Sequence, residues 1–306
     1  MKKFFVVIAA LSFGFAAMAQ DFNAAVETFN NAAQAESKAD ALDLFKQAYA
    51  QFLACEEPEA ADKVEELKNI LPNYCLAIAK EKLNAKDYEG ALAVLKEAAD
   101  YGQEFGLEEK VADANKYTGL AYKQMGKTAL ANKDAATAFT NLKKCVEFTP
   151  ADGEAQFLLG RILLSSGKVD DAKAAFAVAA ENGKADDVKK QLFNYYYTNG
   201  QKKQQAKQYA PAIEDYNAAL EADPESEKVA TLYYKMGIAY GAMGKKAEQN
   251  QALVKHCELN PAADEAILAT IAQNAKALGD KETAKTFYGK LVDSATFGKE
   301  AKEYLK

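Results

Sequence analysis

The sequence predicts an all-α fold assembled from repeated pairs of antiparallel helices. The 306-residue chain is rich in alanine and contains only six prolines. Alanine is the strongest helix former, whereas proline interrupts helices. Small and aromatic side chains also recur at fixed distances along the chain. A fixed repeat distance indicates a structural unit that stacks on copies of itself.

The repeat is clearest in the middle of the chain. Gly160, Ala172, Phe176 and Ala179 are separated by 12, 4 and 3 residues. The same spacings occur in two further stretches: Gly126, Ala138, Leu142, Cys145 with Pro150, and Gly200, Ala212, Tyr216, Ala219 with Pro224. Antiparallel helices approach closely only where a side chain is small. Gly and Ala therefore mark the crossing of two helices, and the large residue fills the space beside it.

This pattern resembles the tetratricopeptide repeat, a helix-turn-helix unit of 34 residues. The resemblance implies a right-handed α-solenoid of stacked hairpins. Its units lie near 22–55, 72–105, 119–152, 153–186, 193–226, 230–263 and 265–298, followed by a capping helix over 299–306. The sixth unit has Gln249 and His256 where small residues are expected. Its second helix is therefore predicted to be either looser or shifted by one residue.

Three stretches fall between the units, at 56–71, 106–118 and 187–192. The first two carry apolar residues at helical spacing between charges, so we expect some first helices to be lengthened. Pro72 is expected to kink or restart the helix at that point. We predict a single solenoid over residues 20–306, with a break near 182–184 as the alternative.

Residues 1–19 have the features of a cleavable signal peptide. Two lysines precede an apolar run of about 12 residues, too short to span a bilayer at about 1.5 Å per residue. Ala17 and Ala19 then supply the small residues before a cut at Gln20. The alternative is an N-terminal anchor. We expect a periplasmic or secreted protein with no integral membrane segment after processing, and without lipid attachment because no cysteine follows the apolar run.

The four cysteines, Cys55, Cys75, Cys145 and Cys257, are predicted to be buried thiols. Cys145 and Cys257 are 112 residues apart, in different units. A helix from about residue 59 would carry Cys75 about 24 Å from its start. Disulfides need Cα atoms within about 7 Å, so neither a Cys145–Cys257 nor a Cys55–Cys75 disulfide fits.

Charge and motif content argue against several functions. Without the first two lysines, 36 basic residues face 44 acidic ones, a formal charge of −8. This excess of acid argues against nucleic acid as a partner. The chain has one histidine, His256, expected in the core or at its edge, and no zinc or phosphate-loop motif. We therefore predict no enzyme activity, no cofactor and no metal.

The resemblance also implies which residues line a concave groove, because the first helix of each unit forms the inner surface. These predicted groove residues are Lys80, Lys123, Lys127, Phe157, Arg161, Asn194, Tyr197, Gln201 and Tyr234. Arg161 is the only arginine in the chain, and its planar fork of donors suits a carboxylate. We predict a scaffold or adaptor that binds an extended or carboxylate-bearing peptide of a protein partner.

Two alternatives remain open at this point. The lysines could be ordinary solvated residues on a surface that is unused or serves self-association. The groove could instead bind carbohydrate, with sugar rings stacked on Phe157, Tyr197 and Tyr234, although the chain has no tryptophan.

Overall fold

The computed structural model describes residues 21–306, and every regular element in that range is a helix. The chain forms two compact units, with the boundary between residues 168 and 169. This boundary falls inside the predicted repeat 153–186, so a single continuous solenoid stays a prediction. The predicted signal peptide at 1–19 lies outside the described residues. The all-α class is confirmed.

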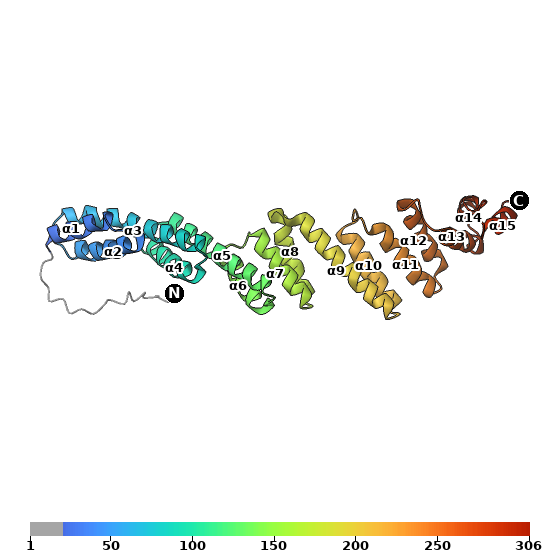
Figure 1. Cartoon of the computed structure of the whole chain (residues 1–306), viewed down its shortest axis with the longest axis horizontal. Coiled ribbons are helices and arrows are strands. Elements are labelled where there is room, and N and C mark those ends of the chain that lie inside the picture. Colours follow the sequence, from blue (N-terminus) through green and yellow to red (C-terminus); the bar gives the residue numbers. More distant parts are fainter. Residues whose placement is uncertain (1–20) are drawn as a thin grey trace. The chain divides into compact units, whose positions relative to one another are not determined.

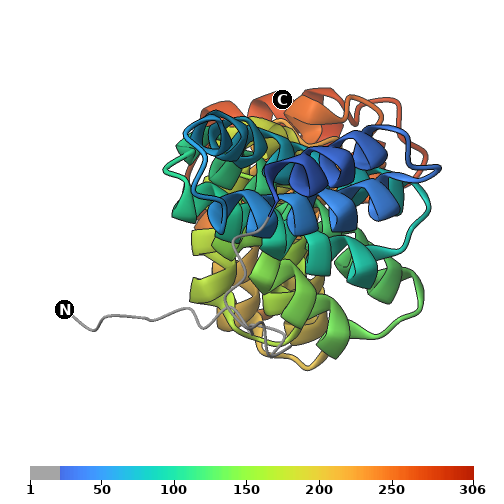
Figure 2. The same cartoon turned by 90° about the vertical axis from the view of Figure 1, so that its left-hand side faces the viewer.

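The first unit is a stack of helices in which each packs on the next along the chain (Figure 1). Figure 2 shows α1 and α2 side by side at the start of this stack. The helices are α1 (Phe22–Ala33), α2 (Lys38–Leu53), α3 (Glu59–Asn84), α4 (Tyr88–Glu104), α5 (Glu108–Ala131), α6 (Ala135–Phe148) and α7 (Gly153–Ser165).

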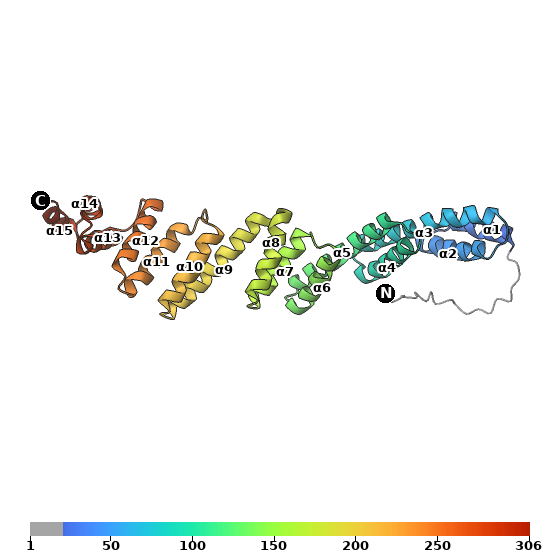
Figure 3. The same cartoon turned by 180° about the vertical axis from the view of Figure 1, so that it is seen from behind.

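The second unit repeats this order of packing, and Figure 3 shows its paired helices α9 and α10 from behind. A kinked connection at 180–184, with φ of +85° at Gly183, joins α8 to α9. The helices are α8 (Val169–Ala179), α9 (Ala185–Gln205), α10 (Tyr209–Ala222), α11 (Val229–Ala242), α12 (Lys246–Leu259), α13 (Glu265–Leu278), α14 (Lys281–Gly289) and α15 (Gly298–Tyr304).

The residues between the predicted repeats lengthen first helices, as expected. Helices α3, α5 and α9 have 26, 24 and 21 residues, whereas α7, α11 and α13 have 13 or 14. Pro72 lies inside α3 and does not restart it. Proline lacks only one backbone donor, and the buried apolar residues on both sides of Pro72 keep the two halves of the helix in the same packing.

Only glycine fits at these crossings of two paired helices, because a Cβ atom would overlap a side chain of the partner helix. A Cβ atom added to Gly126 would lie 2.8 Å from Leu142 Cγ. One added to Gly200 would lie 2.6 Å from Tyr216 Cε1. In both hairpins the large residue follows the glycine by 16 positions. The close approach inferred from the repeat spacing is therefore present.

The sixth hairpin accommodates two large residues without shifting its second helix. Leu253 packs on Gly237, where an added Cβ would lie 2.5 Å from Leu253 Cδ2, again at a separation of 16 residues. Gln249 finds room over Gly241, where an added Cβ would lie 2.4 Å from Gln249 Nε2. His256 is 7% exposed, and its Nδ1 lies 2.8 Å from the Ala230 carbonyl oxygen. Of the two predicted alternatives for this helix, looser packing or a one-residue shift, the shift is therefore wrong, and His256 is a core residue.

The turns within the hairpins share a feature that the sequence spacing did not reveal. In every hairpin but the first, the residue at the same position of the turn has a left-handed backbone, which costs L-residues other than glycine about 1 kcal/mol. Three of these residues are lysines and three are glycines: Lys86, Lys133, Lys207, Gly167, Gly244 and Gly279. The regularity of this turn supports a repeated hairpin geometry.

The two ends of the described chain differ from the central hairpins. In the first hairpin Phe29 takes the place of the small residue, and its ring meets Phe45 edge-on at 5.4 Å. At the C-terminal end α15 packs Tyr304 against Tyr288, with ring centres 4.6 Å apart. Leu305, which directly follows α15, is 39% exposed.

The four cysteines are free thiols, with Cys75 and Cys145 buried and the other two half-buried. Burial raises the pKa of the Cys75 thiol to about 12, so this side chain is protonated at neutral pH.

Over residues 21–306, no helix is both long enough and apolar enough to cross a membrane.

The helix crossing gives a direct test of stability. We expect Gly200→Ala to lower the free energy of unfolding by about 1–3 kcal/mol, because the new methyl group overlaps Tyr216 and this outweighs the better helix propensity of alanine. Gly289→Ala, at the end of α14 where nothing lies within 4 Å, serves as the control and should be neutral or stabilising. Urea unfolding followed by circular dichroism measures both. Equal stability of Gly200→Ala and wild type would contradict the role of this crossing.

Candidate functional site

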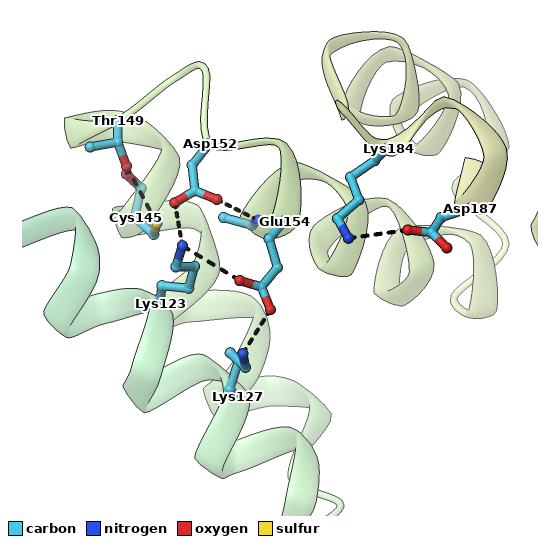
Figure 4. A network of polar contacts seen from close by, with 9 residues as sticks. Lys123, Lys127, Cys145, Thr149, Asp152, Glu154, Lys184 and Asp187 are labelled. Carbon is cyan, nitrogen blue, oxygen red and sulfur yellow. Dashed lines mark hydrogen bonds and ion pairs between the residues drawn. The ribbon is translucent and has the colours of Figure 1, made fainter. Parts of the chain in front are cut away.

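Two predicted groove lysines, Lys123 and Lys127, lie one turn apart on α5 and are already engaged in ion pairs (Figure 4). Lys123 Nζ lies 2.8 Å from Asp152 Oδ2 and 3.5 Å from Glu154 Oε2. Lys127 Nζ lies 2.7 Å from Glu154 Oε1. Asp152 also caps α7, where its Oδ1 accepts a hydrogen bond from Ala155 N at 3.0 Å. These four charged side chains, which we call the Lys–acid network, tie α5 to the start of α7.

The Lys–acid network is partly shielded from solvent. The side chains of Lys123 and Asp152 are only 16% and 19% exposed. Burial acts to lower the pKa of Lys123, but its hydrogen bond to Asp152 and the two nearby carboxylates outweigh burial and raise that pKa. The hydrogen bond from Lys127 lowers the pKa of Glu154. A ligand carboxylate at these lysines would have to displace acids already in place, so the network is first of all a link between two hairpins.

The remaining predicted residues of the first unit lie on α3 and α7. Lys80 is exposed on α3, and its Nζ lies 4.9 Å from the ring centre of Tyr117. On α7 the guanidinium carbon of Arg161 lies 5.9 Å from the ring centre of Phe157, one turn earlier. Arg161 is exposed and forms no ion pair with any residue in the described part of the chain. Its charge is therefore available to a ligand.

In the second unit, Asn194 and Tyr197 lie one turn apart on α9, and both are contacted by a residue that the repeat positions did not predict. Lys228 donates a hydrogen bond from Nζ to Asn194 Oδ1 at 2.9 Å and lies 6.0 Å from the ring centre of Tyr197. Tyr197 stacks on Phe193 at 5.8 Å, and burial raises the pKa of Tyr197. Lys228 stands between two repeats, so no repeat position marked it.

Gln201 and Tyr234 complete the predicted set. Gln201 follows Tyr197 by one turn on α9 and is half-buried. Tyr234 on α11 lies beside His256, with ring centres 5.4 Å apart, and so belongs partly to the packing of α11 on α12. The structure thus groups Lys123 with Lys127, Phe157 with Arg161, and Asn194 with Tyr197 and Gln201. The contacts of Lys80 and Tyr234 are with residues outside the predicted set, Tyr117 and His256.

Gln204, three residues after Gln201 on α9, has a structural role. It accepts a hydrogen bond from Tyr216 Oη at 2.6 Å and donates one to the Lys235 carbonyl oxygen at 3.2 Å. Its amide therefore joins α9, α10 and α11. The sequence offered one signal for this role, since Tyr216 is the large residue of its repeat and a buried hydroxyl needs a partner.

The side chains that commonly hold metal ions do not gather in the described residues. No three His, Cys, Asp or Glu side chains between residues 21 and 306 lie together in a way that could hold a metal ion. The only histidine is committed to the core through Ala230.

Comparison with known families identifies the repeat. Residues 129–191 match the family model described as tetratricopeptide repeat. Residues 129–191 are therefore tetratricopeptide repeat sequence. The match includes the whole predicted unit at 153–186, and the hairpins on either side have the same glycine or alanine crossing and turn. The tetratricopeptide repeat is in general a non-catalytic scaffold for protein–protein interaction.

Several solved tetratricopeptide repeat structures are similar to the chain at low identity. MamA 41-end from Desulfovibrio magneticus RS-1 is 20% identical with a TM-score of 0.29, covering 57% of this chain and 93% of that one. Pseudomonas aeruginosa pilF is 14% identical with a TM-score of 0.30, covering 78% and 97%. The TPR2AB domain of yeast Sti1, in complex with pHSP90, is 14% identical with a TM-score of 0.34, covering 93% and 96%. No curated protein matches the chain.

The Lys–acid network predicts a pH-dependent stability. Because the pKa of Glu154 is lowered in the fold, its stabilising contribution is present above its ordinary pKa of about 4.5 and is lost as the pH falls through the folded value. We expect Glu154→Gln to be less stable than wild type at pH 7 by up to about 1 kcal/mol, since the pair is partly screened by solvent. This difference should shrink as the pH is lowered from about 5.

Urea unfolding of wild type and Glu154→Gln over a pH series measures this effect. Glu147→Gln is the matched control, because Glu147 is exposed and forms no ion pair within the described residues. A difference that stays constant with pH would show that Glu154 acts through packing alone.

Proposed function

We propose that the protein is an exported, non-catalytic scaffold that binds an extended peptide segment of a protein partner. The proposal is supported by the repeat fold, whose first helices present polar and aromatic side chains over successive hairpins. The observation that carries it is Arg161, which is exposed, stacked near Phe157 and without an ion pair among the described residues. A planar guanidinium that is exposed and has no ion pair among the described residues suits a carboxylate on the partner.

The ion pairs of the Lys–acid network bear on which basic residue would bind a carboxylate of the partner. Lys123 and Lys127 are already paired, so they hold the groove together more than they attract the partner. In the second unit, Asn194, Tyr197 and Gln201 offer amide and aromatic groups, and Asn194 lines a hollow that also contains Lys228 and acids such as Glu227. Amide and aromatic groups suit the backbone and neutral side chains of an extended segment. We therefore assign the carboxylate of the partner to Arg161 and not to the two lysines.

Carbohydrate binding is less well supported. Tyr197 is stacked on Phe193, and Tyr234 lies against His256. A sugar ring needs an open aromatic face, and part of each of these rings is covered by the protein itself. We therefore favour a peptide.

We also propose that residues 1–19 direct the chain to the periplasm or out of the cell. The proposal rests on the two lysines, the short apolar run and the small residues before Gln20.

The role of Arg161 can be tested once a partner has been captured by crosslinking in intact cells and identified by mass spectrometry. We expect Arg161→Ala to weaken binding of the partner peptide by about tenfold, the loss of one hydrogen bond to a charged group, and Arg161→Lys to weaken it less. Lys127→Ala should have a smaller effect because Glu154 already neutralises Lys127. Isothermal titration calorimetry measures all three. Unchanged affinity of Arg161→Ala would show that the surface of α7 around Arg161 does not bind the partner.

Export has a separate test. When the full chain is expressed in a Gram-negative bacterium, we expect periplasmic material whose N-terminal sequence begins at Gln20. Replacing Ala17 and Ala19 with Asp should leave the precursor uncleaved. Cytoplasmic protein that retains residues 1–19 would show that the assignment is wrong.

A further inference from the structure

A second surface of the C-terminal unit has the features of a binding site. It is a hollow over α11 and α12, which we call the α11–α12 hollow. Among the residues that line it are Tyr233, Met236, Tyr240, Glu248, Val254 and Lys255. Successive residues of a helix point about 100° apart. Tyr233, Met236 and Tyr240 recur at steps of three and four, so they form one side of α11, and Tyr234 lies off that side. The hollow is therefore separate from the predicted groove.

The floor of the hollow is apolar. Met236 is 6% exposed, and Ala252 beside it is 5% exposed. Val254 and the two tyrosine rings remain partly exposed. An apolar side chain that entered the hollow would remove these surfaces from water, which is favourable by about 25 cal/mol per Å².

The two charged residues that line the hollow differ in their state. Lys255 is neutralised by Glu258, whose Oε2 lies 2.7 Å from its Nζ. Glu248 forms no ion pair or hydrogen bond with any residue in the described range. The hollow therefore presents one uncompensated negative charge.

Tyr240 adds to the attraction for a cation. Burial raises the pKa of Tyr240, and the charge of Glu248 raises it further, as expected if the carboxylate lies near the phenol. The face of a tyrosine ring attracts a cation, and a carboxylate beside it strengthens the attraction.

We propose that the α11–α12 hollow binds a basic amphipathic segment of a protein partner. One apolar side chain of that segment fills the floor over Met236 and Val254. A lysine or arginine on the same side of the segment pairs with Glu248 beside Tyr240. This surface goes beyond the peptide groove and does not depend on Arg161.

The proposal is tested with three synthetic helical peptides and the processed chain. Each peptide has the same alanine-based sequence with two leucines, and on the leucine face it carries Lys, Gln or Glu. Fluorescence anisotropy of a labelled peptide measures affinity. We expect the Lys peptide to bind about fivefold more tightly than the Gln peptide, and the Glu peptide to bind most weakly, since a partly desolvated charge pair contributes about 1 kcal/mol.

Variants separate charge from packing. Glu248→Gln should abolish the preference for Lys over Gln. Val254→Ala should weaken all three peptides alike by about threefold, from the loss of buried methyl groups. Glu227→Gln, an exposed acid of the same unit outside the hollow, and Arg161→Ala should change nothing. Circular dichroism and urea unfolding verify that each variant is folded.

Three results would overturn the proposal. The first is no binding of the Lys peptide at about 1 mM, the weak limit for a specific segment. The second is equal affinity for Lys and Gln peptides, or a preference for Glu. The third is a Glu248→Gln variant that keeps the wild-type preference.

Discussion

The fold depends on one steric constraint, the close approach of two helices in each hairpin. Where the first helix carries glycine, the large residue 16 positions later occupies the space that a β-carbon would need, as with Gly126 and Leu142 or Gly200 and Tyr216. Dense packing at this crossing fixes the two helices relative to each other. The polar side chains on the outer turns of the same helices then acquire defined positions, which a binding surface requires.

The sixth hairpin shows how the constraint tolerates exceptions. Gln249 occupies a position where other hairpins have alanine, and the glycine that makes room for it, Gly241, lies eight residues earlier on the partner helix. His256 likewise replaces a small residue and gains the Ala230 carbonyl as a partner. A buried polar group is tolerated when it is hydrogen-bonded. Space and hydrogen bonding, more than residue type, therefore decide what the repeat accepts.

The sequence was sufficient for the class of fold, the hairpins and the lengthened helices, because these follow from local spacing and helix propensity. The sequence was insufficient to predict which charged side chains are paired with one another. Lys123 and Lys127 fall at repeat positions that are predicted to face the groove, but the acids that neutralise them lie at the start of α7, Asp152 as its N-cap and Glu154 in its first turn. Pairing between hairpins depends on side-chain reach, which spacing does not encode. Lys228 was missed because it lies between two repeats and so occupies no repeat position.

The packing of each helix on its neighbours in chain order has a kinetic consequence. Within each unit, the contacts join segments that are close in sequence. Forming such contacts closes only short loops, so little chain entropy is lost before the first contacts form. Each unit should therefore fold rapidly and from several starting points. A damaged hairpin should melt locally while hairpins farther along the same unit stay intact.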